Sequence, residues 1–170
     1  EEKGIHYLID AYKKLDTDKK LVICGDSSDT DDYVAKLKES ARGHDGIIFT
    51  GFISGDTLAS IYSNAYAVCL PSNIEGMSIS LLEALAYSNA VVCSDIPENV
   101  SVCENSAVFF KKGDADDLAE KLTMLLRSPE TVEKLRSVAK SDVLARFSWD
   151  RTADETVAFY KNVLKGSHTI

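Results

Sequence analysis

The chain has 170 residues, of which 45% are hydrophobic and 27% are charged, and its formal net charge is −8. This length and composition suit one domain with its own core, and the negative charge argues against a nucleic-acid surface and against unaided binding to anionic lipid. No apolar run approaches the ~20 residues of a membrane span, so we expect no membrane contact from this domain alone.

The first predicted element is a helix over residues 5–15, whose apolar side chains recur on one face at helical spacing. In an α/β domain a strand normally comes ahead of such a helix. We therefore expect the chain to be a fragment that lacks its first strand.

Apolar, strand-like runs and helical patterns then alternate along the chain with short loops between them. The predicted strands cover residues 20–24, 46–50, 66–70, 90–93 and 107–110, and the predicted helices lie at 33–41, around 58–62, at 78–87, after Asp114, and at 130–146 and 149–164. This alternation predicts a Rossmann-like, doubly wound and mainly parallel sheet flanked by helices, as one domain over residues 1–170.

Several local features refine these elements. Ser54 or Asp56 is a candidate cap for the third helix, and Asp114 is one for the helix that follows it. Residues 94–99 are expected to form a loop. Four leucines of the helix after Asp114 are expected to face inward, and Trp149, the only tryptophan, is expected to pack; the leucines are Leu118, Leu122, Leu125 and Leu126.

The stretch PSNIEGMSISLLEALA, residues 71–86, is the part of the chain that points most clearly to function. It leads from an apolar strand through a short loop into a helix, and this arrangement places backbone N–H groups at the carboxyl end of a sheet, where open α/β folds bind ligands. If Ser78 caps the helix, its hydroxyl and the free first-turn N–H groups form an anion site with roughly half a positive charge.

Two carboxylates frame this stretch, Glu75 in the loop and Glu83 inside the helix. At about 1.5 Å per residue, Glu83 lies roughly 7 Å along the helix axis from the anion site. That distance avoids repulsion of a phosphate and allows the carboxylate to accept hydrogen bonds from a diol such as a ribose. The stretch as a whole therefore fits a holder for a nucleotide sugar, whereas the spacing of the two glutamates taken alone is more typical of a solvated helix surface.

The sequence contains four cysteines, whose positions indicate whether they form disulfides. Cys24, Cys69 and Cys93 lie in strand-like runs and Cys103 follows in a predicted loop or turn, without CxxC spacing or a paired histidine. This pattern favours buried reduced thiols over disulfides or metal ligands, and with them a cytoplasmic location.

Several features of the central stretch occur together and in order: the apolar strand, Pro71-Ser72, Glu75-Gly76, Ser78 and residues 81–84, LLEA. This combination resembles the C-terminal, donor-binding domain of the family 4 retaining glycosyltransferases, which have the GT-B architecture. The resemblance covers nearly the whole chain, from Lys3-Gly4 to the last helix. It implies one half of a GT-B fold, a missing N-terminal acceptor-binding domain, and a last helix, residues 149–165, that crosses onto that domain.

The resemblance also implies roles for individual residues. Lys3 matches a lysine that contacts the donor diphosphate, Glu75 orients the donor hexose, and Glu83 holds the ribose. The implied catalytic residues are Glu75 and Lys3, and the implied substrate-binding residues are Gly25, Gly51, Phe52, Ile53, Glu75, Gly76, Met77, Ser78, Ile79 and Glu83. From the residues alone, Lys3 also fits a solvated terminal lysine, and Gly51-Phe52 a strand–helix turn with a core phenylalanine.

The sequence departs from the family pattern in three places. An arginine that ends the family's first strand has no match here, and Ser27 and Ser28 stand where the family commonly has a glycine and a proline. Ser88-Asn89-Ala90 replaces a Gly-x-Pro turn, and we expect Asn89 to take the left-handed conformation that ends the helix.

The implied activity is transfer of a sugar from a nucleotide-diphosphate sugar, with a UDP-sugar favoured, to a glycan or other acceptor with retention and without an obligatory metal. The full-length protein is expected in the cytoplasm or at the cytoplasmic face of a membrane. Two other classes stay open: a non-catalytic GT-B-like interaction domain, and half of a nucleotide-sugar epimerase.

Overall fold

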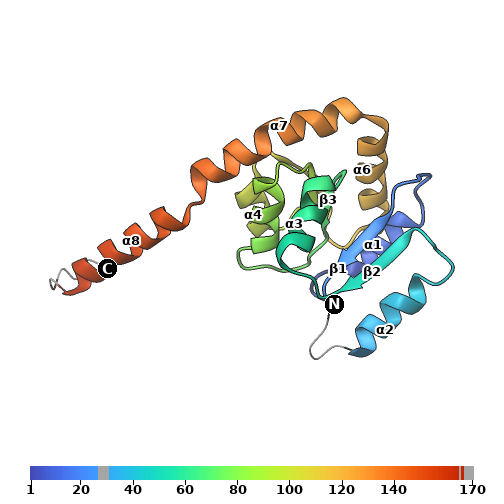
Figure 1. Ribbon diagram of the computed structural model, residues 1–170, viewed down its shortest axis with the longest axis horizontal. Coiled ribbons are helices and arrows are strands. Elements are labelled where there is room, and N and C mark those ends of the chain that lie inside the picture. Colours follow the sequence, from blue (N-terminus) through green and yellow to red (C-terminus); the bar gives the residue numbers. More distant parts are fainter. Residues whose placement is uncertain (27–30, 165, 167–170) are drawn as a thin grey trace.

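The computed structural model describes residues 1–26, 31–164 and 166, and within them strands and helices alternate as the sequence predicts (Figure 1). The departures at Ser27 and Ser28 lie outside the described residues. The elements are α1 (Ile5–Tyr12), β1 (Leu21–Cys24), α2 (Asp31–Ser40), β2 (Ile47–Gly51), α3 (Gly55–Asn64), β3 (Val68–Leu70), α4 (Ile79–Ala86), β4 (Val91–Ser94), α5 (Pro97–Cys103), β5 (Ala107–Phe110), α6 (Ala115–Arg127), α7 (Pro129–Arg146) and α8 (Trp149–Leu164).

The strands pair in parallel but form two separate pieces of sheet. β1 pairs with β2, and β3, β4 and β5 pair in that order. The α/β class and the parallel pairing are confirmed, while the expected single sheet is divided between β1 and β3.

The core lies on both faces of β4, all four residues of which are buried. Val92 packs with Leu8 and Leu118 of α1 and α6, whereas Val91 packs with Leu81 and other residues of α4, α5 and α7. Alternate residues of one strand thus meet helices on opposite faces, which is the doubly wound arrangement and explains why these strands are continuously apolar.

Some local expectations are confirmed and others are wrong. The Asp114 side chain accepts hydrogen bonds from the amides of Asp116 and Asp117, as an N-cap should. Residues 97–99, expected to end a loop over 94–99, begin helix α5, and Pro97 is tolerated in its first turn, where the missing N–H costs no helical hydrogen bond. Ser88, with φ of 60°, takes the left-handed conformation in place of Asn89, which donates its side-chain amide to the Ala84 carbonyl.

The thiols are reduced, but their burial differs from the expectation. Cys93 and Cys103 are buried, Cys69 is half-buried and Cys24 is exposed at the end of β1. Burial raises the pKa of the Cys69 thiol to about 12, so this thiol is held protonated at neutral pH. The prediction of buried thiols is therefore wrong for Cys24, and Cys103 lies in α5.

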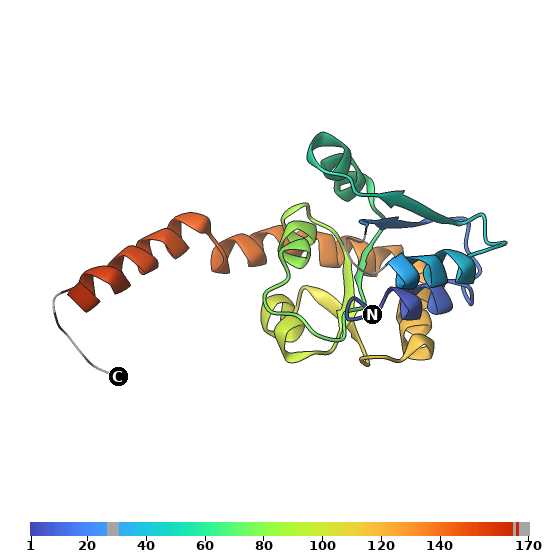
Figure 2. The same ribbon diagram turned by 90° about the horizontal axis from the view of Figure 1, so that it is seen from below.

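Helix α8 extends away from the rest of the domain (Figures 1 and 2). It buries none of its residues, and 81% of the Trp149 surface is exposed. Trp149 therefore does not pack within the described part of the chain, contrary to the expectation. Large apolar side chains are exposed along the same helix: Val157, Phe159, Tyr160, Val163 and Leu164.

The first residues of the chain dock on the end of β3. The Asn73 amide donates to the Glu2 carbonyl at 2.7 Å, and Gly4, with φ of 64°, lies against the carbonyl of Pro71. A Cβ at Gly4 would sit 2.0 Å from that carbonyl oxygen. Only glycine permits this approach, and it sets the position of Lys3.

Gly4→Ala is expected to destabilise the domain more than Gly43→Ala does. Both glycines have positive φ, but a Cβ at Gly43 meets nothing within 4 Å. Gly43→Ala should therefore cost about 1–2 kcal/mol of unfolding free energy from backbone strain alone, and Gly4→Ala should cost more because of the clash. Urea denaturation of both variants measures the difference, and equal losses would contradict the docking of Gly4 on Pro71.

Candidate functional site

Glu75 is the centre of a small polar cluster at the carboxyl end of β3. Its Oε1 accepts hydrogen bonds from Ser72 Oγ and from Lys3 Nζ, each at 2.7 Å. The Glu75 side chain is only 8% exposed, whereas that of Lys3 is 66% exposed. The fold thus brings together the two implied catalytic residues, which lie 72 positions apart in the sequence, and leaves the ammonium group open to solvent.

A series of hydrogen bonds between buried polar groups holds the backbone at Ser72 in place. Ser94 Oγ, at the end of β4, donates to the Ser72 carbonyl at 2.5 Å, and Asn99 Nδ2, in α5, lies 3.1 Å from Ser94 Oγ and 3.2 Å from the Ser94 carbonyl. All three residues are buried. These contacts fix the backbone from which Glu75 is held. The sequence analysis missed Ser94 and Asn99; the available signal was a serine that closes an otherwise apolar strand.

Helix α4 begins beside Glu75. Ser78 occupies the N-cap position and is buried, and its carbonyl accepts hydrogen bonds from the amides of Leu81 and Leu82. Its side chain makes no capping hydrogen bond, so the expected hydroxyl cap is wrong. The first-turn N–H groups still point out of the helix end, as helix geometry requires. Gly76, Met77 and Ile79 are exposed around them.

Glu83 lies on the side of α4 that faces α3. It is exposed, and its Oε2 accepts a hydrogen bond of 3.4 Å from the Tyr62 hydroxyl, which also lies 3.4 Å from the Ser80 carbonyl. The Tyr62 ring stacks on Tyr87, with ring centroids 5.4 Å apart. Burial, with a smaller contribution from the Glu83 charge, raises the pKa of Tyr62 to about 12.

The ends of β1 and β2 form a second part of the site. The Gly25 amide donates to the Gly51 carbonyl at 2.9 Å, and both glycines have positive φ. Phe52 follows with 77% of its surface exposed, so the alternative of a core phenylalanine is wrong. Ile53 is half-buried next to it.

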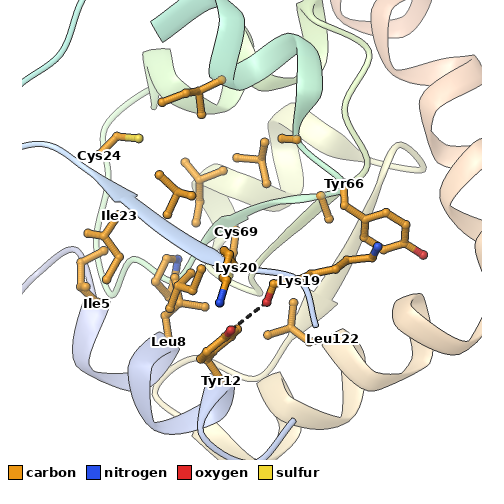
Figure 3. Close-up of a pocket in the computed structure, with 18 of the residues that line it drawn as sticks. Ile5, Leu8, Tyr12, Lys19, Lys20, Ile23, Cys24, Tyr66, Cys69 and Leu122 are labelled. Atoms are coloured by element: carbon orange, nitrogen blue, oxygen red, sulfur yellow. Dashed lines mark hydrogen bonds between the residues drawn. The ribbon is translucent and has the colours of Figure 1, made fainter. Parts of the chain in front are cut away.

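A groove of about 800 Å³ lies beside the polar cluster (Figure 3). Residues of both β1 and β3 line it, and its lining also includes Lys3, Glu75, Ser78 and Tyr62. The other predicted binding residues do not line this groove: Gly25, Gly51, Phe52, Ile53, Gly76, Met77, Ile79 and Glu83. The structure therefore brings three of the predicted residues, Lys3, Glu75 and Ser78, into the lining of the groove.

Two general features complete the description. Across residues 1–26, 31–164 and 166, no group of three or more His, Cys, Asp or Glu side chains is placed to hold a metal ion. No helix in the same residues is long and apolar enough to cross a bilayer.

Comparison with known proteins decides the family. The model of the family "Glycosyl transferases group 1" matches residues 1–142, which is most of the chain. The chain belongs to the group 1 glycosyl transferases.

Similarity to individual proteins agrees with this assignment. The chain is 34% identical to the uncharacterized glycosyltransferase MJ1607 of Methanocaldococcus jannaschii, over 94% of this chain and 42% of that protein. It is 31% identical to the alpha-maltose-1-phosphate synthase of Mycobacterium tuberculosis, over 95% and 45% of the two chains. The chain thus spans less than half the length of these two relatives.

The fold also matches solved structures. Anabaena Alr3699/HepE in complex with UDP-glucose superposes with a TM-score of 0.85 at 20% identity, over 92% of this chain and 45% of that one. At this identity the match establishes the fold, which is that of a GT-B glycosyltransferase domain.

The contact between Tyr62 and Glu83 predicts a titration. The Tyr62 phenol is expected to ionise near pH 12, so the stability that its neutral form contributes is complete below about pH 10 and is lost as the pH rises toward 12. Glu83→Gln removes a negative charge beside the phenol and should lower the Tyr62 pKa, while burial keeps it above 10. Ultraviolet titration, with Tyr62→Phe to assign the signal, measures this shift.

Glu120→Gln is the matched control, because Glu120 is an exposed glutamate on α6. It should leave the Tyr62 pKa unchanged. A Tyr62 pKa that Glu83→Gln fails to lower would contradict the placement of the Glu83 carboxylate next to α3.

Proposed function

We propose that this domain binds the nucleotide-diphosphate sugar donor, a UDP-sugar, of a retaining family 4 glycosyltransferase. The observation that carries the proposal is the convergence of Lys3 and Ser72 on Glu75 beside the start of α4. A cation, a fixed carboxylate and a helix N-terminus then occupy one edge of the sheet, where open α/β folds take phosphate-bearing ligands. The UDP-glucose complex of Anabaena Alr3699/HepE, which has the same fold, supports this choice of donor.

The diphosphate would lie between Lys3 and the first-turn amides of α4. The Lys3 side chain is 66% exposed, so its ammonium group can donate to a bound anion while it stays paired with Glu75. Charge-assisted hydrogen bonds of this kind contribute roughly 1.5–3 kcal/mol each, and they strengthen as negative charge develops on the leaving diphosphate. In a chain of net charge −8, this local offset is what makes a dianionic ligand acceptable.

The remaining residues would hold the two ends of the donor. Glu83 would accept hydrogen bonds from the ribose hydroxyls, and Glu75, with the backbone of Gly76, Met77, Ser78 and Ile79, would orient the hexose. The base would lie near the joined ends of β1 and β2, at the set Gly25, Gly51, Phe52 and Ile53, where Phe52 is exposed.

The chemistry would be a displacement at the anomeric carbon of the donor. The bond between that carbon and the β-phosphate oxygen breaks, and its electron pair stays on the phosphate. The acceptor oxygen forms the new bond on the same face, and its proton passes to the leaving phosphate. Lys3 and the start of α4 would stabilise the charge that the phosphate gains, without an obligatory metal.

Transfer would also require a second domain. An acceptor must be positioned and water excluded from the reacting atoms, and both need the opposite wall of a cleft. We therefore propose that the full-length enzyme, which acts in the cytoplasm, has an acceptor domain ahead of this one. The exposed apolar face of α8 would cross onto it.

The two ends of the donor can be tested separately with UDP and uridine. In the full-length protein, Lys3→Met is expected to weaken UDP binding about tenfold, close to the lower end of the range for a charge-assisted hydrogen bond, and to leave uridine binding unchanged. Glu83→Gln should weaken UDP and uridine by a similar factor, because both carry the ribose. Calorimetry for UDP and ligand-observed NMR for uridine provide the two affinities.

Glu120→Gln again serves as the control and should change neither affinity. Equal loss of UDP and uridine in Lys3→Met, or no loss in Glu83→Gln, would contradict the assigned positions. If the parent protein binds none of UDP, GDP and ADP, the interaction-domain alternative is favoured.

A further inference from the structure

We propose that Tyr62 is a positioning residue for the sugar donor, because its hydroxyl holds the Glu83 carboxylate in the orientation that accepts the ribose hydroxyls. This inference rests on the proposed function, in which Glu83 binds the ribose. Three observations carry it: the contacts of Tyr62 along one face of α4, the dependence of Glu83 on those contacts, and the place of Tyr62 at the far end of the helix that follows the proposed base site.

Tyr62 lies along one face of α4. Ser80, Glu83 and Tyr87 follow one another at spacings of three and four residues, which places them on the same side of that helix. The Tyr62 hydroxyl lies 3.4 Å from the Ser80 carbonyl and 3.4 Å from Glu83 Oε2. Its ring stacks on the Tyr87 ring at an interplanar angle of 12°. The stacked ring therefore directs a single hydroxyl proton toward the carbonyl and the carboxylate, which share it.

The Glu83 carboxylate depends on this contact for its orientation. An exposed glutamate side chain has several rotatable bonds and samples many rotamers unless a partner orders it. In residues 1–26, 31–164 and 166, the Tyr62 hydroxyl is the one group that bonds to the Glu83 side chain. A neutral donor suits this task, because an ionised carboxylate has about four lone-pair sites. One bond from Tyr62 leaves room for two ribose hydroxyls, whereas a lysine or arginine would compete for the same oxygens.

The Tyr62 hydroxyl stays a hydrogen-bond donor at neutral pH. The side chain is half-buried, and burial raises its pKa to about 12, with a smaller contribution from the Glu83 charge. Tyr62 also lines the groove that includes Glu75 and Ser78. The hydroxyl is thus neutral, bonded to Glu83 and part of the side chain that borders this groove.

The place of Tyr62 in the chain links two parts of the proposed donor site. Helix α3 begins at Gly55, two residues after Ile53, which belongs to the set near which the base would lie. Tyr62 lies in the last turn of the same helix and contacts α4 there. None of the α3 residues is fully buried, so side-chain contacts such as that of Tyr62 hold α3 against α4. The Tyr62 hydroxyl would therefore act on the nucleoside end of the donor and not on the diphosphate.

The affinities of the full-length protein for UDP and 2′-deoxy-UDP, measured by calorimetry, test this role. The parent should prefer UDP by about tenfold or more, because the 2′-hydroxyl bonds to an oriented carboxylate. Tyr62→Phe keeps the stacked ring and removes only the hydroxyl, so it should lower this preference to about twofold. Glu83→Ala should lower it by a similar factor. Adding Tyr62→Phe to Glu83→Ala should then have no further effect, because residues that act through one interaction are not additive.

Tyr12→Phe is the matched control. Tyr12 is also half-buried, and its hydroxyl donates to the Lys19 carbonyl at 2.7 Å, just ahead of the amino end of β1 and thus at the opposite edge of the sheet from the site. This variant removes a tyrosine hydrogen bond of the same kind and should leave the preference for UDP unchanged. Thermal unfolding of both phenylalanine variants separates a loss of stability from a loss of binding.

The outcomes separate this inference from the proposed function. If the preference for UDP falls in Glu83→Ala but not in Tyr62→Phe, the ribose assignment stands and only the positioning role is overturned. If Tyr62→Phe weakens UDP equally with and without the Glu83 carboxylate, Tyr62 acts through packing, and the positioning role is again wrong. If Glu83→Ala keeps the preference of the parent, the ribose assignment of the proposed function fails, and the positioning role fails with it.

Discussion

The site depends on one tertiary contact, the docking of the first residues on the carboxyl end of β3. The Asn73 amide binds the Glu2 carbonyl, and Gly4 lies against the Pro71 carbonyl at a distance that no side chain would permit. This contact carries Lys3 to Glu75 across 72 positions of sequence. Neither local helix propensity nor the loop after β3 could create the cluster alone, so the candidate site forms only when the domain folds.

Much of the fold could be predicted because it follows from periodicity. The continuous apolar run of β4 reflects helices on both of its faces, and the Asp114 cap precedes a regular amphipathic helix. The predictions that were wrong concern features that depend on contacts between distant segments. The Ser78 side chain makes no capping hydrogen bond although Ser78 occupies the N-cap position, and the division of the sheet depends on which strands pair.

The candidate site was predictable to a similar degree. The order of residues in the stretch 71–86 identified Glu75 as a candidate site residue, and the fold brings Lys3 into contact with it. The buried hydrogen bonds that support this cluster were not predictable, because Ser94 reaches Ser72 from a neighbouring strand and Asn99 reaches Ser94 from a helix where the sequence predicts a loop. Likewise, no pattern in the sequence linked Tyr62 to Glu83, which meet across two helices.

Charge explains how an acidic domain can present a site for an anionic donor. Of the two carboxylates in the central stretch, Glu75 is neutralised by Lys3, and Glu83 lies farther along α4, where a neutral pentose suits it better than a phosphate. The diphosphate is therefore placed next to the positive charge of Lys3, and the neutral ribose next to the negative charge of Glu83.

The most direct test is a crystal structure of the full-length protein with UDP-glucose bound. The account predicts diphosphate oxygens within about 3 Å of Lys3 Nζ and of the first-turn amides of α4, with the ribose hydroxyls on the Glu83 carboxylate. A nucleotide bound away from the end of β3, or a Glu83 side chain that makes no contact with the ribose, would contradict it.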